Sequence, residues 1–315
     1  MKKLIILGGT GFIGECFIDF FLNKNIKKYK LSKLILIGRD INKIKKKYNL
    51  KNKNIFLKKI NLNKKLNRIP KADFILHAAE NYDNSSGNKL KDYTKSFNLT
   101  KRICNYYNKI KFPTKMIFVS SGAVYGKNIK KKKFLETQKI NKNNFKNLSK
   151  NKKNYALNKF KSETYIRKNF KKDYEIIRLF SVIGKQVPQD KNYVVGNFIK
   201  DSKLNDRIVV NSKNPNLIFR SFVNSKDLII ILIKLFFLNR NYKSVYNVGS
   251  EEYVSILKLS KLFSNYSKKK VQLINKKNKY KNEIDFYVPN INKLKYFLKI
   301  KKTVKLNRSI IECLK

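Results

Sequence analysis

A glycine-rich segment near the N-terminus constrains the fold of this chain more than any other feature. Residues 3–7 are mostly apolar and read as a short buried strand, and Gly8-Gly-Thr-Gly-Phe-Ile-Gly14 follows directly. Apolar residues after Gly14 predict a helix. Glycines at this three-residue spacing, Gly8, Gly11 and Gly14, let the backbone turn tightly and approach a pyrophosphate, which the free N–H groups of a helix start attract. The segment therefore predicts the start of a βαβ unit that binds a dinucleotide.

Further apolar runs, separated by stretches of helical pattern, are typical of a parallel sheet covered on both faces. They lie at residues 34–37, 55–57, 74–76, 116–119 and 176–180, and the pattern becomes irregular after about residue 180. We expect an α/β fold built on a doubly wound parallel sheet.

The net charge of the chain is strongly positive, with 74 Lys and Arg against 20 Asp and Glu, or +54. Clustered basic residues bind nucleic acids or anionic membranes, but a recognition surface should form a patch. Here Lys and Asn are abundant throughout, as in 127–133 and 141–147. We therefore attribute the charge to biased composition and expect no specific nucleic-acid partner. A hydrophobic content of 42% excludes wholesale disorder.

The three cysteines, Cys16, Cys104 and Cys313, lie far apart, which excludes a disulfide framework and a cysteine-based zinc site. We expect no bound metal. The apolar stretch after Lys3 is too short for a signal peptide. The longest apolar run, 228–238, is interrupted by Lys234 and falls short of the ~20 residues that cross a bilayer. These features predict a cytoplasmic protein without a membrane span.

Several further motifs follow the glycine segment in a fixed order: His77-Ala-Ala79, Ser120-Ser-Gly-Ala-Val-Tyr-Gly126 and Tyr155-x-x-x-Lys159. Together they resemble the extended short-chain dehydrogenase/reductases, specifically the NAD-dependent epimerase/dehydratase group that acts on nucleotide sugars. The resemblance continues through residues 178–184, 220–227, 246–250 and 285–289, so it covers nearly the whole chain. It implies a doubly wound parallel Rossmann sheet and a smaller, discontinuous C-terminal α/β substrate domain. The Rossmann domain would span residues 1–180, with a later segment at about 220–248 returning to it, and the substrate domain would take mainly residues 181–315.

A tyrosine four residues before a lysine places both side chains on one helix face, where the ammonium can stabilise a phenolate and lower the tyrosine pKa. The spacing alone is weak evidence, because this lysine-rich chain has four such pairs, which begin at Tyr29, Tyr107, Tyr155 and Tyr266. Only the pair Tyr155 and Lys159 lies between the serine segment and the run at 176–180. Position in the fold therefore favours this pair.

The resemblance implies a catalytic set of Ser121, Tyr155 and Lys159. Tyr155 would exchange a proton with a sugar hydroxyl, and Ser121 would hydrogen-bond the sugar oxygen. Lys159 would also bind the nicotinamide ribose. The alternative for Ser120 and Ser121 is that both merely end a strand. The single histidine, His77, ends a strand in a segment that lines the cofactor cleft in the family, so we do not expect it to be catalytic.

The residues after the second strand bear on the choice of cofactor. An NAD enzyme usually has an acidic residue there, whereas an NADP enzyme supplies Arg for the phosphate. Gly38 falls at the expected acidic position, followed by Arg39 and Asp40. We expect NAD(P), with NADP(H) slightly favoured over NAD, although Asp40 could serve NAD. Including contacts implied by the resemblance, the expected cofactor-binding residues are Gly8, Thr10, Gly11, Phe12, Ile13, Gly14, Arg39, Asn61, Leu62, His77, Ala78, Ala79, Asn98, Ser120, Tyr155 and Lys159.

Three reactions share this machinery. The family's dehydratases place Asp-Glu after the catalytic Ser or Thr, but here Gly122 and Ala123 stand there, which disfavours dehydration. A UDP-glucose 4-epimerase-like activity and an NADPH-dependent nucleotide-4-keto-sugar reductase stay open. A rival in another class is a catalytically idle relative that binds RNA or a partner; retention of the catalytic set argues against it. The resemblance further implies a homodimer and a nucleotide-diphosphate-sugar substrate held by Ser181, Asn197 and Arg220.

Overall fold

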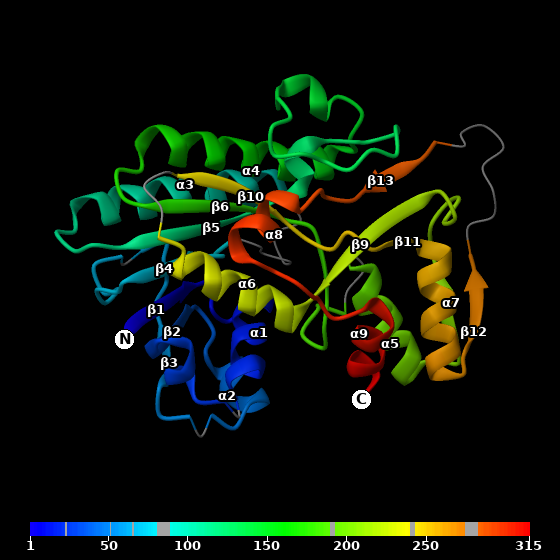
Figure 1. Ribbon diagram of the computed structural model, residues 1–315, viewed down its shortest axis with the longest axis horizontal. Helices are drawn as coiled ribbons and strands as arrows, with labels where there is room; N and C mark the ends of the chain where they lie inside the picture. The colour runs from blue at the N-terminus through cyan, green and yellow to red at the C-terminus, as the bar shows by residue number, and fades with distance from the viewer. Residues whose placement is uncertain are drawn as a thin grey trace. The chain divides into compact units, whose positions relative to one another are not determined.

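A computed structural model describes residues 1–22, 24–50, 52–64, 66–80, 89–189, 193–239, 243–274 and 283–315, with the backbone alone at 89–92. The chain divides into two compact units (Figure 1). The first comprises residues 1–126, 141–178 and 229–246, and the second comprises 127–140, 179–228 and 247–315. Residues 127–140 thus belong to the second unit, although they precede residue 180, and the segment that returns to the first unit is 229–246.

The first unit is built on a seven-stranded sheet in the order β10-β6-β5-β4-β1-β2-β3. The pairs β1–β2, β2–β3, β1–β4 and β4–β5 are parallel. This doubly wound α/β arrangement confirms the predicted fold class, and its strand order reverses between β1 and β4, where such sheets bind ligands. The strands are β1 (Lys2–Leu7), β2 (Leu31–Gly38), β3 (Ile55–Lys59), β4 (Phe74–His77), β5 (Lys115–Ser121), β6 (Tyr174–Leu179) and β10 (Ser244–Val248).

Helices cover both faces of this sheet (Figure 1). Neighbouring residues of a strand point to opposite faces. On one face, Ile75 of β4 belongs to a buried cluster with Ile103 of helix α3 (Lys89–Lys109) and Ile166 of helix α4 (Lys150–Asn169). On the other face, the neighbouring Phe74 stacks on Phe236 of helix α6 (Ser225–Phe237), with 4.9 Å between ring centroids. The helices are α1 (Phe12–Phe21), α2 (Asn42–Lys47), α3 (Lys89–Lys109), α4 (Lys150–Asn169) and α6 (Ser225–Phe237), with 3-10 turns η1 (Ile26–Tyr29), η2 (Gly122–Tyr125) and η3 (Lys142–Phe145).

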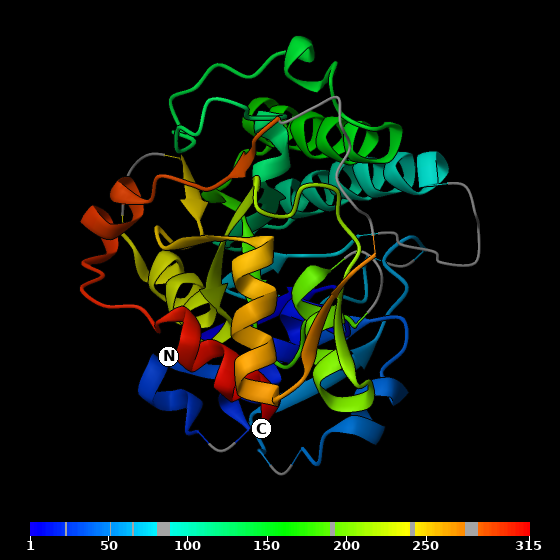
Figure 2. The ribbon, with the colours of Figure 1, turned by 90° about the vertical axis from the view of Figure 1, so that its right-hand side faces the viewer.

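The second unit contains a four-stranded sheet in which β9 is central. β9 pairs parallel with β7 and β13 and antiparallel with β11. Helices α5 and α7 pack together through Phe198 and Phe263, with ring centroids 5.7 Å apart (Figure 2). The elements are β7 (Ser181–Ile183), α5 (Val194–Leu204), β8 (Arg207–Val210), β9 (Ile218–Asn224), β11 (Tyr253–Ser255), α7 (Ile256–Ser267), β12 (Lys270–Leu273), β13 (Asp285–Tyr287), α8 (Asn292–Leu298) and α9 (Leu306–Leu314).

Within the described ranges, no helix is both long enough and apolar enough to cross a membrane.

Candidate active site

The glycine turn links β1 to α1. Gly8 has a φ of +85°, and a Cβ there would lie 2.7 Å from the Ala79 Cα, so packing and backbone conformation both require glycine. At Gly11, by contrast, a Cβ would meet only the Gly8 carbonyl oxygen, at 3.3 Å. The glycine at 11 therefore leaves space above the start of α1. Gly11 is the N-cap of that helix and no side chain caps it. An uncapped helix start with open space before it fits the pyrophosphate of a dinucleotide.

The end of β2 explains why the expected acidic residue is missing. A Cβ at Gly38 would lie 2.9 Å from the Cβ of Thr10, so the Thr10 side chain fills the space that an acid would need. The Asp40 carboxylate accepts hydrogen bonds from the backbone N–H groups of Asn42 at 3.1 Å and Lys43 at 3.3 Å. Asp40 thus stabilises the start of α2, while Arg39 is exposed.

Lys159 connects helix α4 to the end of β5. The residue is 5% exposed, and its Nζ donates to the backbone carbonyl of Val119 at 2.7 Å. It also forms an ion pair with Glu80. The Tyr155 ring, one helical turn earlier, has its centroid 5.9 Å from this Nζ. Ser121 ends β5, and its Oγ accepts a hydrogen bond from the Ala123 N–H at 3.2 Å.

The three predicted catalytic residues therefore lie on two elements, Ser121 at the end of β5 and both Tyr155 and Lys159 on α4. The hydrogen bond from Lys159 to the Val119 carbonyl joins the two elements. Of the other three Tyr-x-x-x-Lys pairs, the one at Tyr107 starts in the core, where its tyrosine is 1% exposed. Tyr29 lies in η1 and Tyr266 on α7 of the second unit. Position in the fold, and not spacing, distinguishes Tyr155 and Lys159 from them.

His77 ends β4 and is buried. Its Nε2 lies 3.0 Å from the Thr100 hydroxyl on α3. The Thr100 hydroxyl also lies within hydrogen-bond distance of the Ser96 carbonyl, at 3.2 Å. Burial, with a smaller contribution from the Lys159 charge, lowers the pKa of His77 to about 3. A neutral ring held by Thr100 is suited to packing beside Lys159 and not to proton transfer.

The remaining expected cofactor residues occupy varied positions. The backbone N–H of Ala78 donates to the Leu7 carbonyl at 3.0 Å, and Ala79 lies against Gly8. Asn61 accepts from the Asn63 N–H at 3.0 Å, next to the buried Leu62. Asn98 is exposed on α3.

The sequence analysis did not find Thr100, the α3 residue whose hydroxyl lies beside His77 at the end of β4. The available signal was spacing: Tyr93, Ser96 and Thr100 recur at helical intervals, and the structure buries all three. Two glutamates were also missed, Glu80 and Glu163. Glu163 follows Lys159 by four residues, and that spacing on one helix face was the available signal.

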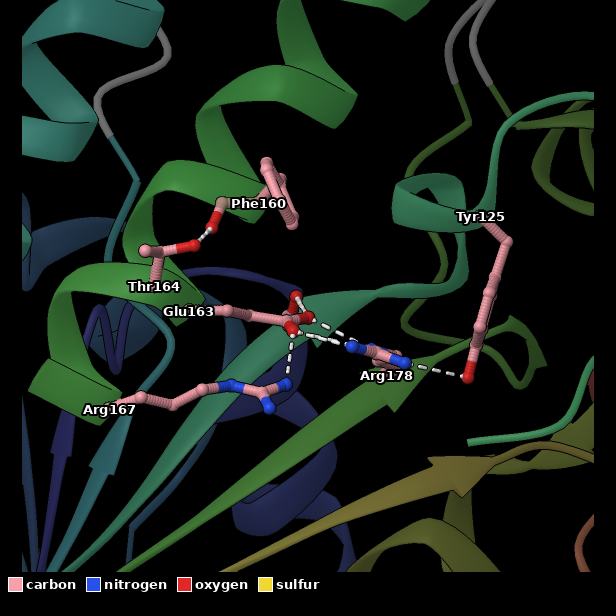
Figure 3. A network of polar contacts seen from close by, with 7 residues as sticks. Tyr125, Phe160, Glu163, Thr164, Arg167 and Arg178 are labelled. Atoms are coloured by element: carbon pink, nitrogen blue, oxygen red, sulfur yellow. Dashed lines mark hydrogen bonds and ion pairs between the residues drawn. The ribbon is translucent and has the colours of Figure 1, made fainter. Parts of the chain in front are cut away.

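Ser120 donates its hydroxyl hydrogen to Glu163 at 2.6 Å. The same carboxylate binds Arg178 of β6 and the exposed Arg167 (Figure 3). The proposed cofactor contact of Ser120 would thus have to use its oxygen, since its hydrogen is engaged.

In the second unit, Arg220 lies on β9 opposite Tyr287 of β13, with its guanidinium 5.6 Å from that ring. It forms an ion pair with Asp285 at 2.7 Å and donates to the carbonyls of Phe219 and Asp285. Ser181 is half-buried on β7, which also pairs with β9, and Asn197 is half-buried on α5. The described residues contain no group of three or more His, Cys, Asp or Glu that could hold a metal ion.

A sequence model of the NAD dependent epimerase/dehydratase family matches residues 4–249. The chain belongs to this family. The match begins within β1 and ends just after β10, and so includes the glycine turn, the serine segment and the Tyr155–Lys159 pair. This confirms the resemblance that the motifs indicate. Comparison with curated proteins returned no match.

Solved structures with the fold of this epimerase/dehydratase family member cover nearly the whole chain. A UDP-N-acetylglucosamine 4-epimerase from Methanobrevibacter ruminantium M1, in complex with UDP-N-acetylmuramic acid, is 20% identical with a TM-score of 0.78, over 99% of this chain and 97% of that one. A UDP-glucuronic acid 4-epimerase from Bacillus cereus, with UDP-glucuronic acid and NAD, is 21% identical with a TM-score of 0.77, over 98% and 96%.

A third such structure is a dTDP-glucose 4,6-dehydratase from Bacillus anthracis in complex with NAD. It is 15% identical with a TM-score of 0.78, over 100% of this chain and 96% of that one. At these identities the likeness establishes the fold, which epimerases and dehydratases share, so the reaction must be argued from the site.

Proposed function

We propose that this family member is an NAD(P)-dependent nucleotide-sugar 4-epimerase in which Tyr155, Lys159 and Ser121 act on one sugar carbon. The observation that carries the proposal is the position of the Lys159 ammonium. It is bound to the Val119 carbonyl, two residues before Ser121, and lies 5.9 Å from the Tyr155 ring centroid. A cation held there favours the phenolate that proton abstraction requires.

A bound nicotinamide supplies a reversible hydride acceptor. The residues of this chain move and hold the proton. Tyr155 accepts the proton of a sugar hydroxyl on its phenolate oxygen and later returns it. Lys159 stabilises the phenolate and holds the ribose of the cofactor, while Ser121 hydrogen-bonds the sugar oxygen. The pKa of His77, about 3, keeps that ring neutral near neutral pH, so His77 does not add a second positive charge beside Lys159.

The glycine turn would hold the pyrophosphate at the start of α1, and Thr10 and Arg39 would flank the adenosine ribose. We propose NADP(H) as the preferred cofactor. Thr10 fills the place of an acidic side chain at Gly38, and the start of α2 already engages Asp40. Neither arrangement favours a carboxylate on the ribose hydroxyls, whereas Arg39 suits a phosphate.

The proposed substrate is a nucleotide-diphosphate sugar bound by Ser181, Asn197 and Arg220. Two of the similar structures hold UDP-sugars, UDP-N-acetylmuramic acid and UDP-glucuronic acid, which supports this class. The ion pair with Asp285 of β13 holds the Arg220 guanidinium in one orientation. A guanidinium held in this way is suited to bind a phosphate.

Dehydration is disfavoured, because Gly122 and Ala123 begin η2 without a titratable side chain. The second candidate is an NADPH-dependent 4-keto-sugar reductase, which the engagement of Asp40 by α2 favours. The deciding experiment incubates the protein with UDP-, GDP-, CDP- and dTDP-sugars and each nicotinamide cofactor. We expect interconversion of 4-epimers with no net change in cofactor. Stoichiometric oxidation of NADPH by a 4-keto sugar would establish the reductase, and inertness with every pair would contradict both activities.

A further inference from the structure

A buried carboxylate lies on α4 one turn beyond Lys159. Glu163 is 1% exposed, and its Oε1 accepts the Ser120 hydroxyl hydrogen at 2.6 Å. Arg178 of β6, 3% exposed, donates from Nε to Oε1 at 3.1 Å and from Nη2 to Oε2 at 2.8 Å (Figure 3). This two-point contact fixes the guanidinium plane against the carboxylate.

Arg178 extends the network to Tyr125, which follows Ser121 in the chain. Its Nη1 donates to the Tyr125 hydroxyl at 2.9 Å, and its guanidinium lies 4.7 Å from the Tyr125 ring centroid. Tyr125 ends η2, the turn that begins directly after Ser121. The Glu163–Arg178 pair therefore anchors Ser120 before, and Tyr125 after, the proposed catalytic serine.

The same helix face carries the rest of the proposed machinery. Tyr155, Lys159 and Glu163 follow one another at four-residue intervals, so they lie along one side of α4. Lys159 binds the carbonyl of Val119, and Glu163 binds the side chain of Ser120. Successive turns of α4 thus contact successive residues of β5, and these two contacts fix the position of the helix along the strand.

We propose that Glu163 and Arg178 are positioning residues that hold Ser121 at a set distance from Tyr155 and Lys159. The inference rests on the proposed function and adds two residues to its site.

Energetics favours positioning over stability as the use of this ion pair. Burying two charges costs free energy of desolvation, and apolar residues of similar volume are often as stabilising. Burial by itself lowers the pKa of Arg178, but the hydrogen bonds and charge of Glu163 outweigh burial and raise that pKa, so the guanidinium stays charged. We therefore attribute the ion pair to the geometry it fixes. The Glu163 carboxylate accepts one hydrogen bond from the buried Ser120 and a two-point contact from the buried Arg178, which leaves it little freedom to rotate.

Two mild variants test the proposal without breaking the ion pair. Ser120→Ala and Tyr125→Phe each remove one hydroxyl and one anchor. We expect each to lower kcat about 10-fold with KM changed less than about 3-fold, because misplacing a reacting group by ~1 Å costs up to about 100-fold. Tyr125→Phe is the cleaner variant, since Ser120 is also a proposed cofactor contact. For Ser120→Ala, an unchanged cofactor Kd by calorimetry is therefore part of the expected result.

Two variants on α4 serve as matched controls. Arg167→Ala removes a cation from the same carboxylate, but that side chain is 47% exposed. Thr164→Val removes a hydroxyl that donates to the Phe160 carbonyl of its own helix (Figure 3). Both should keep kcat within about twofold of the parent value, because the exposed Arg167 ion pair contributes little and the Thr164 hydroxyl bonds the backbone of its own helix.

Hydrogen exchange supplies a readout that does not depend on turnover. Amide exchange in residues 121–126 should become at least several-fold faster in Ser120→Ala and Tyr125→Phe than in the parent protein, and Arg167→Ala should not change it. Unchanged exchange and unchanged kcat in both anchor variants, in fully folded protein, would overturn the proposal. If the parent protein turns over no nucleotide sugar, the proposed function fails. Faster exchange in the anchor variants would then still support the anchoring of Ser121.

Discussion

The Lys159 ammonium donates to the Val119 backbone carbonyl at 2.7 Å, which ties the middle of α4 to the end of β5. Lys159 is 5% exposed, so this hydrogen bond forms away from bulk water. It brings a side chain of the helix to the strand that ends in Ser121. The geometry of the proposed catalytic set follows from this one contact, because Tyr155 precedes Lys159 by a single helical turn.

Tyr155→Phe should lower kcat by about 100- to 10,000-fold, the range that general acid–base groups contribute. The ring and its packing remain, so the affinity for NADP⁺ should stay unchanged by calorimetry. Tyr266→Phe is the matched control, because it alters a tyrosine with the same spacing to a lysine on α7 of the second unit. It should leave kcat unaltered. An active Tyr155→Phe protein would remove Tyr155 from the mechanism.

The two glycines of the turn should respond differently to alanine. Gly8→Ala forces a φ of +85° on a side-chain-bearing residue and a 2.7 Å contact with Ala79, so the free energy of unfolding should fall by at least about 1 to 3 kcal/mol. Gly11→Ala meets only the Gly8 carbonyl, at 3.3 Å. It should keep a near-parent midpoint in urea but bind cofactor at least about 10-fold more weakly, since close backbone approach requires glycine there. Equal cofactor affinity in Gly11→Ala and the parent would exclude this use of the turn.

His77 should make stability depend on pH in mildly acid solution. Its pKa of about 3 in the folded state lies below the 6.5 of an exposed imidazole, so the unfolded state binds the proton more readily. The contribution to stability is complete above about pH 6.5 and is lost as pH falls toward 3, with about 2 kcal/mol lost by pH 5. Urea unfolding at pH 7.5 and pH 5 should show this loss in the parent but not in His77→Gln. The same loss in both proteins would assign the effect to other groups.

Arg39→Ala tests the cofactor preference. We expect the Kd for NADP⁺ to rise about 10- to 100-fold, the effect of losing a bidentate phosphate contact, with little change in the Kd for NAD⁺. Arg308→Ala, an exposed arginine on α9 of the second unit, is the control for the loss of one positive charge. Equal weakening of both cofactors by Arg39→Ala would contradict the assignment of Arg39 to the phosphate that distinguishes NADP⁺ from NAD⁺.

Some features of the site can be predicted from the amino-acid sequence alone, because they are local. The turn at Gly8–Gly14 depends on backbone freedom and on its place between a strand and a helix, and both are visible in adjacent residues. The apolar runs predicted six of the seven strands of the main sheet for the same reason, since alternation and burial act over a few residues. The order of motifs along the chain then selected Tyr155 among four tyrosines of identical spacing.

Other features depend on contacts between distant residues. The sequence placed an acid, Asp40, two positions after Gly38 but held no sign that it would bind the start of α2. It likewise could not indicate that Thr100 would bind His77, 23 residues away, or that Glu163 would bind Ser120, 43 residues away. Spacing has no meaning at such separations, because the partners meet only after helices pack on the sheet.

The sequence by itself therefore determined the family, the Rossmann architecture and the catalytic candidates, all of which follow from short-range backbone geometry and motif order. Only the tertiary structure decided which polar groups are buried together. Asp40 binds the start of a helix, and the neutral His77 forms a buried hydrogen bond with Thr100. Glu163 and Arg178 bind Ser120 and Tyr125, which lie before and after Ser121 in the chain. The physical reason is desolvation, because an unpaired buried polar group costs free energy and the fold alone determines which partner is within reach.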